Sequence, residues 1–514
     1  MKKQTLLEGT FILMVAGLIN RVLGFGLRMV LTRIIGDKGI GLFQMIFPIF
    51  LTFSILATFG LPVAVSKFVS EKIAQKNQQE SVKILKLAIS FTVFSGTLFS
   101  IIFYLAAPFI ANNILNNPQT EIILKAIAPA LFFITNASIL RGFFQGLRMM
   151  TPTAISQVIE QITRIIVTLI ILKLLAAYSL RYQAAGLALG ITAGEGLGLL
   201  TLVLLFFKLR QKPKKRTTIS PPKSNRALLF KKLIKFGFPI TVSKLVASTT
   251  YSLEAILIPT RLQAAGYSVA VATSLYGQLS GMALQVIHLP MVITIAVNSN
   301  LIPAISEAVS NQNRSQLLNR YHQALRLVIY TGLPAAIIFY SLPEEICDIL
   351  FGYPEAGEIL KLISVGVLFL YLLQIMNGML QGLGKPKLVV INSIIGLICE
   401  VLIIYILVSQ PQFGLKGAGI AIIVRYLVIT LLNFMAIGKE IGFALDLKQL
   451  VFKPLLGGSL LFLVIPFLET LLLDLGITDL TNLILSITGG MLAYTLVLII
   501  TGGITSRDLN QLIN

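Results

Sequence analysis

Charged residues are scarce in this chain. Only 12% of its 514 residues are Asp, Glu, Lys or Arg, whereas 56% are hydrophobic, and the mean hydropathy is +0.87. Soluble domains carry about 25% charged residues. Because the deficit extends over the whole length, it excludes a soluble domain with a single anchor and predicts a polytopic membrane protein.

Acidic residues are the scarcer of the two signs, at 21 against 42 Lys and Arg, which gives a net charge of +21. In a soluble protein such an excess would suggest nucleic acid as a partner. Here the basic residues cluster between apolar segments, as the positive-inside rule of membrane proteins describes. We therefore expect membrane lipids, and no nucleic acid, as partners.

Cysteine and histidine are nearly absent, with two residues of each. Cys347 and Cys399 form no disulfide framework, and Cys399 lies within an apolar run. The sequence also lacks a P-loop, an H-E-x-x-H motif and a paired Cys/His cluster. These absences predict no enzymatic activity, no cofactor and no metal site. The N-terminal MKKQTLLEG leads into an apolar segment too long for a signal peptide, so we expect no cleaved leader.

Long apolar runs are what the sequence has in abundance. A helix needs about 20 mostly apolar residues to cross the hydrocarbon layer. The runs predict an all-α membrane protein with about 14 transmembrane helices. Their expected limits are 10–35, 40–66, 84–110, 122–146, 154–177, 184–208, 233–259, 271–299, 322–342, 357–381, 388–409, 415–437, 455–474 and 482–503.

The charges of the loops alternate along these segments. Basic loops follow the even-numbered spans, and the stretch from Lys208 to Lys235 holds eleven basic residues and no acidic one. Acidic loops lie between them, such as the one with Glu344 and Glu345 after the ninth span. Since basic loops stay in the cytoplasm, we expect a multi-pass protein of the bacterial cytoplasmic (inner) membrane with both termini in the cytoplasm.

The two halves of the chain share short motifs. The pattern G-x-x-Q-G-L at 142–147 recurs at 378–383, an offset of 236 residues (378 − 142), and two further pairs show offsets of 234 and 240. A glycine cap at a helix end is the simpler explanation for any single pair. Three pairs in order predict parallel repeats, a transporter architecture with the substrate route between the halves. The predicted organisation is an N-lobe at 1–208, a basic cytoplasmic linker at 209–230, a C-lobe at 231–440, and two additional spans with a cytoplasmic C-terminus at 441–514.

Two arginines interrupt the first span, VAGLINRVLGFGLRMVLTR. On a helix, Gly17, Arg21, Gly24 and Arg28 share one face, because they follow one another by four, three and four residues. A charge at the bilayer centre costs about 2.5–3.5 kcal/mol on insertion scales, so the arginines should avoid lipid. They either pair with intramembrane carboxylates or line a cationic cavity for an anion such as phosphate, which the planar guanidinium suits.

Other charged residues lie at membrane depth. Glu160 and Arg164, four residues apart in the fifth span, could neutralise each other. Glycines flank Glu195, so another helix could approach it closely. The candidates for binding a coupling H⁺ or Na⁺, or for charge pairing, are Glu160, Glu195, Glu254, Glu400 and Arg425. The candidates for contact with substrate are Arg21, Arg28, Gly17, Gly24, Gln44 and Arg164.

Three stretches resemble a known family: KQTLLEGTFILMVAGLINRVLGFGLRMVLTRIIGDKGIGLFQM, FGLPVAVSKFVSE and ILRGFFQGLRMMTPTAISQVIEQITRI. They are similar to the stage V sporulation protein B group. This group belongs to the polysaccharide transporter branch of the multidrug/oligosaccharidyl-lipid/polysaccharide (MOP) flippase superfamily. The resemblance implies two six-helix lobes plus two C-terminal helices, and a central cavity that opens alternately to each side of the membrane.

The resemblance also implies a cargo, an undecaprenyl-pyrophosphate-linked saccharide such as lipid II or another cell-wall polysaccharide unit, and cell-wall synthesis proteins as partners. The related lipid II flippases share RVLGF, so their first cavity arginine corresponds to Arg21, whereas their second corresponds to Leu27, one residue before Arg28. This departure leaves the cargo open. The alternatives are a small-molecule multidrug cation antiporter and a non-transporting scaffold of a cell-wall assembly complex.

Overall fold

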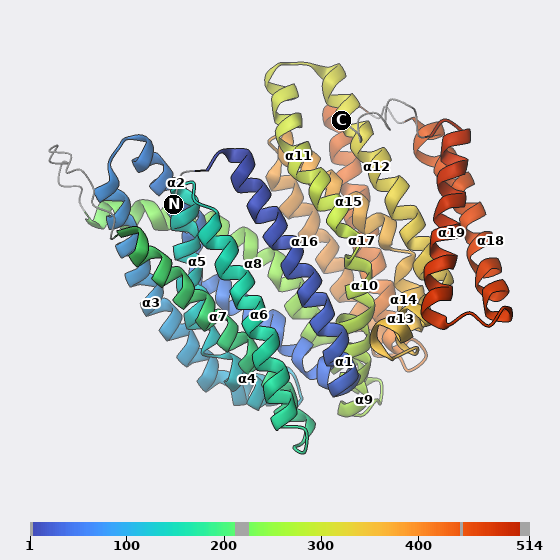
Figure 1. The fold of residues 1–514 in the computed structure, drawn as a ribbon, viewed down its shortest axis with the longest axis horizontal. Coiled ribbons are helices and arrows are strands. Elements are labelled where there is room, and N and C mark those ends of the chain that lie inside the picture. The colour runs from blue at the N-terminus through green and yellow to red at the C-terminus, as the bar shows by residue number, and fades with distance from the viewer. Residues whose placement is uncertain (1–3, 211–225, 443–445, 504–514) are drawn as a thin grey trace. The chain divides into compact units, whose positions relative to one another are not determined.

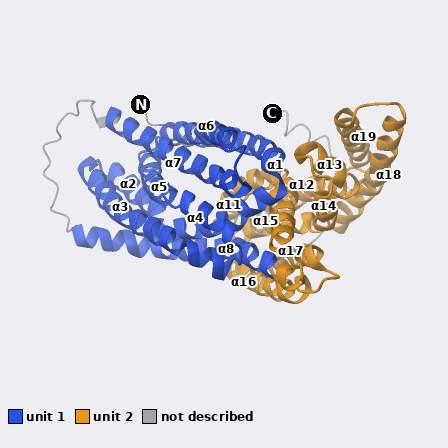
Figure 2. Ribbon diagram, turned by 90° about the horizontal axis from the view of Figure 1, so that it is seen from below, with its two compact units in different colours: residues 1–260 blue, residues 261–514 orange. Residues whose placement is uncertain are grey.

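The computed structural model describes residues 4–210, 226–442 and 446–503 (Figure 1). Within these ranges every regular element is helical, as the sequence predicts. The chain forms two compact units, unit 1 at residues 1–260 and unit 2 at residues 261–514 (Figure 2). Most of the predicted basic linker at 209–230 lies outside the described residues, and the predicted lobe limits stay predictions.

The described part of unit 1 has eight α-helices, the last of which continues four residues into unit 2. These are α1 (Leu6–Thr58), α2 (Leu61–Ala74), α3 (Gln78–Phe109), α4 (Glu121–Ile127), α5 (Ala130–Gly146), α6 (Thr151–Leu174), α7 (Leu180–Arg210) and α8 (Arg226–Ala264). The short elements η1 (Ile110–Ile114) and η2 (Pro118–Thr120) connect α3 to α4.

Unit 2 contains the remaining helices of the described residues. These are α9 (Val269–Tyr276), η3 (Gly277–Ala283), α10 (Leu284–His288), α11 (Met291–Ser310), α12 (Arg314–Ser341), α13 (Pro343–Phe351), α14 (Ala356–Ser364), α15 (Val367–Gly382), α16 (Pro386–Ile403), η4 (Ile404–Val408), α17 (Gly414–Ile441), η5 (Lys448–Phe452), α18 (Lys453–Asp474) and α19 (Asp479–Ile500).

Length and composition allow 11 helices of the described residues to cross a membrane, or 12 if the bent pair α14 and α15 counts as one span. The first of them, Glu8–Ala74, has 67 residues, and as one straight helix it would measure about 100 Å, more than three times the hydrocarbon thickness. It therefore holds both the first and the second predicted span. The count is compatible with the predicted 14 spans, and the chain is a multi-pass membrane protein.

A glycine divides α1 into two helices. Gly36 has φ 69° and ψ 179°, a backbone conformation that is open to glycine and strained for other residues. The first part carries the two arginines, and the second part, from Asp37 to Thr58, is mostly buried at its beginning. This break separates the first predicted span from the second close to the limits expected from hydropathy.

The predicted limits of the eighth span are wrong. The eighth span was expected to run unbroken over 271–299, yet the helix stops after His288 and α11 starts at Met291 and continues to Ser310. Pro290 stands at the N-cap of α11. Proline lacks an N–H group and its ring clashes with the preceding turn, so it interrupts the helix. The run of residues stays apolar, and hydropathy therefore gives no sign of the break.

Glycines bring α6 and α7 into close contact. Four of them recur every fourth residue along one face of α7: Gly186, Gly190, Gly194 and Gly198. A Cβ atom at Gly190 would overlap Thr168 Oγ1 of α6, and one at Gly194 would lie 2.8 Å from the carbonyl oxygen of Glu160. Small residues allow such a backbone approach in membrane proteins. The expectation of a close neighbour beside Glu195 is thus confirmed.

The start of α8 packs into unit 1. Leu229 and Leu233 join a buried hydrophobic cluster with residues of α2, α3, α5 and α7. At Gly60, where φ is +62°, a Cβ atom would overlap the carbonyl oxygen of Gly237. The two backbones can therefore meet only because both positions are glycine, and this contact fixes α8 to the beginning of α2.

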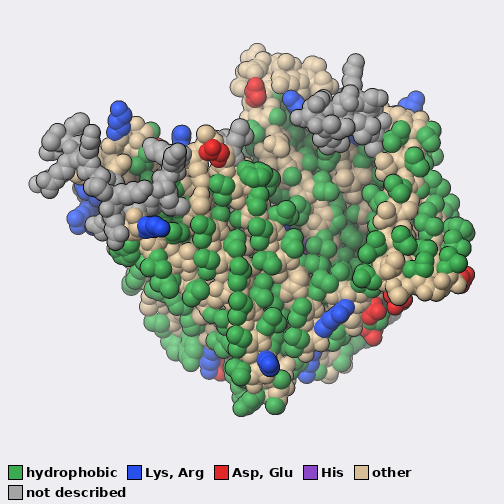
Figure 3. All heavy atoms as spheres, in the orientation of Figure 1, with side chains coloured by type: hydrophobic (Ala, Val, Ile, Leu, Met, Phe, Trp, Pro, Cys, Tyr) green, Lys and Arg blue, Asp and Glu red, His purple; other side chains and the backbone are tan. Residues whose placement is uncertain are grey.

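The flanks of the helices suit a lipid environment. Hydrophobic side chains cover the visible face of both units, and charged ones are sparse there (Figure 3). Among the exposed residues, Leu105 is 70% accessible and Ile500 is 82% accessible. Apolar surface in water costs about 25 cal/mol per Å², whereas the same surface in hydrocarbon costs nothing comparable.

Candidate functional site

The arginine face of α1, made by Gly17, Arg21, Gly24 and Arg28, lies in a helix that packs against α6 and α7. Arg21 is exposed and Arg28 is half-buried. Neither guanidinium has a hydrogen-bond or ion-pair partner among the described residues, and Arg28 Nη1 is buried. A Cβ atom at Gly17 would meet open space. Two cationic groups on this face are thus available to an anion.

Two of the carboxylates that could have paired with these arginines, Glu160 and Glu195, contact other arginines of unit 1. Arg141 Nη2 of α5 donates to Glu160 Oε2 at 2.6 Å, and Arg164 Nη2 donates to Glu160 Oε1 at 2.7 Å. Arg164 Nη2 also lies 3.7 Å from Glu195 Oε1 of α7. We call these residues the charge cluster: Arg141, Glu160, Arg164 and Glu195.

The charge cluster joins three helices at membrane depth. Its side chains are only 6–24% exposed, and a buried charge without partners costs several kcal/mol. Glu160 meets this cost with two short charge-assisted hydrogen bonds. Its pairing with Arg164, expected from their four-residue spacing, is confirmed. The bond to Arg141 is a contact between helices that spacing along one helix does not indicate.

Glu195 has weaker contacts than Glu160. Its side chain is 6% exposed, and its Oε2 is buried without a hydrogen-bond partner among the described residues. The 3.7 Å separation from Arg164 exceeds hydrogen-bond distance. Among the described residues Glu195 Oε2 thus has no donor, and Oε1 has a longer ionic contact with Arg164.

Gln161 lies between the charge cluster and the arginine face. Its Oε1 accepts a long hydrogen bond of 3.4 Å from Arg164 Nη1. Its Nε2 would lie 3.5 Å from a Cβ atom at Gly24 on α1. The side chain is 7% exposed. Gln161 thus accepts a hydrogen bond from the charge cluster through Arg164 and packs beside Gly24 of the helix that carries Arg21 and Arg28.

Unit 2 contains a separate buried ion pair. Arg425 Nε of α17 lies 3.3 Å from Glu400 Oε1 of α16, with side chains 10% and 0% exposed. The guanidinium also lies over the ring of Tyr426, 5.0 Å from its centroid. Glu400 and Arg425 are therefore paired with each other, and charge pairing is one of the two roles that the sequence predicts for them.

Three asparagines connect α15, α16 and α17. Asn392 Nδ2 donates to Asn433 Oδ1 at 2.8 Å, and Asn433 Nδ2 donates to Asn377 Oδ1 at 2.8 Å. Asn377 follows Arg141 by 236 residues (377 − 141), the offset of the repeated G-x-x-Q-G-L motif. Each unit thus connects three consecutive helices through polar side chains, with charges in unit 1 and amides in unit 2.

Sequence reasoning missed these asparagines and also Arg141 and Gln161. Their signal is a polar residue inside an apolar run, which marks an interior face of a membrane helix. The remaining expected site residues are placed as follows: Gln44 is 6% exposed in the second part of α1, and Glu254 is 5% exposed in α8. Their roles stay predictions.

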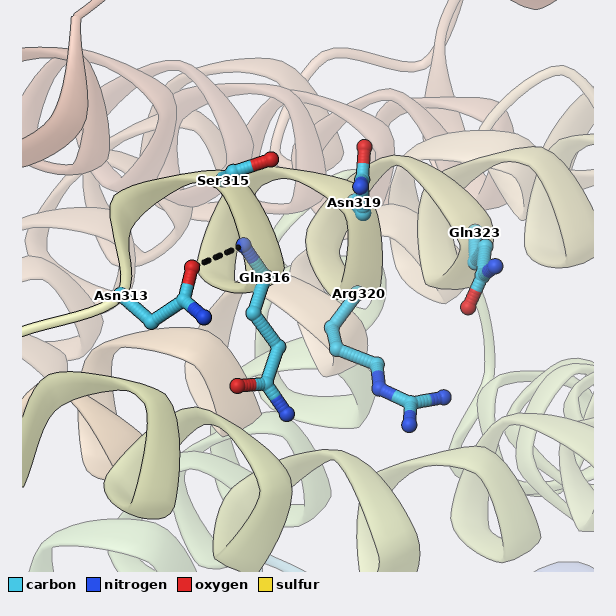
Figure 4. Close-up of a pocket in the computed structure, with 6 residues that line it drawn as sticks. All are labelled: Asn313, Ser315, Gln316, Asn319, Arg320 and Gln323. Carbon is cyan, nitrogen blue, oxygen red and sulfur yellow. Dashed lines mark hydrogen bonds between the residues drawn. The ribbon is translucent and has the colours of Figure 1, made fainter. Parts of the chain in front are cut away.

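A polar hollow on the surface of unit 2 lies apart from all expected site residues. It is lined by Asn313, Ser315, Gln316, Asn319, Arg320 and Gln323, from the first turns of α12 and its cap (Figure 4). Asn313 Oδ1 accepts a hydrogen bond from the Gln316 backbone N–H at 2.9 Å and caps the helix. This explains the hollow as the exposed start of one helix. No group of three or more potential metal ligands occurs among the described residues.

Two family models match the chain. The model described as "Polysaccharide biosynthesis protein" matches residues 6–309, and the model described as "MatE" matches residues 279–406. Stage V sporulation protein B of Bacillus subtilis (strain 168) is 33% identical over 87% of this chain and 86% of its own length. Lipid II flippase MurJ of the same strain is 27% identical over 85% of this chain and 84% of its own length.

Solved structures have the same fold. A structure of lipid II flippase MurJ in an inward closed conformation has a TM-score of 0.70 at 18% identity, over 96% of this chain and 98% of that chain. An inward-facing multidrug resistance MATE family transporter of the MOP superfamily has a TM-score of 0.69 at 15% identity, over 82% and 94% of the two chains. At these identities the likeness concerns the fold alone.

Proposed function

Because the chain belongs to the polysaccharide biosynthesis protein family, within the MOP superfamily of membrane transporters and flippases, we propose that it moves a lipid-linked saccharide across the cytoplasmic membrane. The cargo would be joined to its lipid by a diphosphate, as in undecaprenyl-pyrophosphate-linked precursors of peptidoglycan or of another cell-wall polysaccharide. The protein would work by alternating access, with the headgroup inside and the lipid tail in the bilayer.

The observation that carries this proposal is the pair of unpartnered guanidinium groups on one face of α1. Among the described residues neither Arg21 nor Arg28 has a carboxylate partner, although Glu160 and Glu195 lie in helices that pack against α1. Seven residues separate the arginines, about 10 Å along the helix axis. Each can bind a phosphate through two parallel hydrogen bonds, so together they suit an extended anionic headgroup.

The residues of the face would act in order. The exposed Arg21 would meet the diphosphate first, and the more buried Arg28 would bind it deeper in the membrane. Gly17 and Gly24 would leave room beside the arginines. Gln44 is buried and Arg164 is ion-paired, so they would reach the headgroup only after the helices rearrange. The proposal also includes cell-wall synthesis proteins as partners of this protein, and it places both termini of the chain in the cytoplasm.

A second candidate follows from the MatE match over residues 279–406: export of small cations, as by multidrug antiporters. An unpaired arginine face repels cations, so this candidate requires another binding site. Drug efflux from cells, compared between the wild-type protein and an empty vector, would separate the two functions. The diphosphate hypothesis predicts no efflux.

The test is flipping of a fluorescent lipid-linked disaccharide diphosphate in proteoliposomes. We expect Arg21→Ala and Arg28→Ala to weaken diphosphate binding about 10- to 100-fold, the effect of losing charged hydrogen bonds worth about 1.5–3 kcal/mol. Arg33→Ala is the matched control, because Arg33 is exposed on the same helix but lies off the arginine face. Wild-type flipping by both Arg21→Ala and Arg28→Ala would disprove the proposed site.

A further inference from the structure

We propose that Glu195 is a proton-binding group, and that its protonation, transmitted through Arg164 and Gln161, raises the affinity of the arginine face for a diphosphate. This inference rests on the proposed function, because it assigns a regulator to the same anion site. Under this proposal Glu195, Arg164 and Gln161, which lie outside the arginine face, determine when that face binds its ligand.

Glu195 differs from the other membrane carboxylates in its contacts. Both oxygens of Glu160 accept hydrogen bonds from arginines. Glu400 pairs with Arg425, and Glu254 is engaged in an interaction as well. Glu195 has a buried oxygen, Oε2, without a hydrogen-bond partner among the described residues, and its ion-pair partner Arg164 lies 3.7 Å from Oε1, beyond hydrogen-bond distance. An ionised carboxylate in such a place loses its hydration without full compensation, and a proton on Oε2 removes the cost.

The groups that face Glu195 are few. Glu160 and Arg164 of α6 and Arg141 of α5 act on it electrostatically. On α4, Lys125 and Glu121 form an ion pair with each other at 2.6 Å. Arg21 and Arg28 lie on α1, and Gln161 packs between that helix and the charge cluster. The charge state of Glu195 is therefore set mainly within the charge cluster.

Protonation changes the net charge of the cluster. With both carboxylates ionised, two positive and two negative charges cancel. A proton transferred from hydronium to Glu195 Oε2 forms one O–H bond as the hydronium O–H bond breaks and water is released, and it leaves the cluster with a net charge of +1. Arg164, now attracted only by Glu160 at 2.7 Å, keeps its hydrogen bond to Gln161, whose amide packs beside Gly24 of the arginine face. An anion on that face is then bound more tightly.

The effect is reciprocal. If protonation strengthens binding of the anion, the bound anion strengthens binding of the proton by the same factor. One linked proton can change the affinity by at most about tenfold per pH unit. Gln161 is the positioning residue, since it accepts a hydrogen bond from Arg164 and its side-chain amide packs beside Gly24 of α1.

The proton site is tested first without ligand. Infrared difference spectra of the full-length protein in detergent, taken between high and low pH, should contain the C=O band of a buried protonated carboxyl group. The band should disappear in Glu195→Gln and persist in the control Glu400→Gln, which replaces another buried carboxylate. A wild-type spectrum without the band, or a band unchanged in Glu195→Gln, would overturn the proposal.

The linkage is tested with farnesyl diphosphate, whose affinity for wild type and variants is measured by calorimetry across pH. Glu195→Gln mimics the protonated state, so the ratio of wild-type to variant Kd should rise with pH by up to about tenfold per unit, and the ligand's own titration cancels. Gln161→Leu should keep the infrared band but reduce this pH dependence at least threefold. A constant ratio would refute the linkage.

Two safeguards keep the outcomes distinct. If Glu195→Gln does not fold, Glu195→Asp takes its place: it retains a titratable group farther from Arg164, so the band should remain and its midpoint should move. If the wild type binds no diphosphate at any pH, the proposed function fails, while the infrared band still decides whether Glu195 binds a proton.

Discussion

Arg425 and Glu400 form an ion pair inside unit 2, with Nε 3.3 Å from Oε1 and side chains 10% and 0% exposed. Removing one member of a buried pair strands the other charge and costs about 3–5 kcal/mol, whereas replacing both by apolar residues is often neutral. We therefore expect Arg425→Met to destabilise the protein strongly and the double variant Arg425→Met/Glu400→Met to recover most of the loss. Thermal unfolding in detergent measures this, and a double variant no more stable than the single one would contradict it.

The contact between α6 and α7 predicts opposite effects for two glycine substitutions. In Gly190→Ala the new methyl group would overlap Thr168 Oγ1, and overpacking of this kind costs about 1–3 kcal/mol. Gly26→Ala is the matched control: its Cβ would meet nothing within 4 Å, and alanine favours the helix by about 1 kcal/mol. The unfolding temperature, measured for both variants under the same conditions, should fall for Gly190→Ala and rise for Gly26→Ala. Equal shifts would mean that the close approach has no energetic weight.

Asn433 is the central member of the asparagine chain, since it accepts from Asn392 and donates to Asn377. Asn433→Ala removes both hydrogen bonds at once, whereas Asn377→Ala removes one. Hydrogen bonds between membrane helices contribute about 0.6 kcal/mol each on average. We expect the Asn433 variant to lose about twice the stability of the Asn377 variant in steric-trapping measurements. An Asn433→Ala variant as stable as the wild type would show that water replaces the hydrogen bonds of Asn433.

Cys347 should be chemically inert in the folded protein. It lies in α13, between two spans, and is fully buried. Burial, aided by the negative charge of Glu345, raises the pKa of the Cys347 thiol to about 12. Only the thiolate reacts with alkylating agents, so at pH 9 about one thiol in a thousand is reactive by this pKa.

The measurement is iodoacetamide labelling of a Cys399→Ser variant, in which Cys347 is the remaining cysteine. Labelling of the folded variant should be slow at pH 7–9. It should become fast once a denaturing detergent unfolds the protein and exposes the thiol. Rapid labelling of the folded variant at pH 8 would show that α13 opens to solvent.

Hydropathy was sufficient to predict the all-helical membrane fold and the break near Gly36. A span can be recognised from the hydropathy of its own 20 residues, without knowledge of the helices that pack against it. The eighth segment was different, because Pro290 interrupts the helix while the run stays apolar. Hydropathy measures transfer from water and carries no information on backbone hydrogen bonding.

Contacts within one helix were predictable, and contacts between helices were not. The spacing of Glu160 and Arg164 indicates their ion pair, as 3.6 residues per turn requires. The bond between Arg141 and Glu160 depends on which faces of α5 and α6 meet, and no local pattern encodes that. The repeat offset does relate Arg141 to Asn377, but it cannot show that amides take the place of charges.

The break at Gly36 has a consequence for how the protein enters the membrane. A single non-helical residue, followed by Asp37 and Lys38, connects the two parts of α1, so there is hardly any loop between the first two spans. A translocon would release these two spans nearly together, because so short a connection gives the first span, with Arg21 and Arg28, little freedom to enter lipid before the second span follows. Lengthening this connection with a flexible insert would separate the two insertion events and leave the arginines to partition alone.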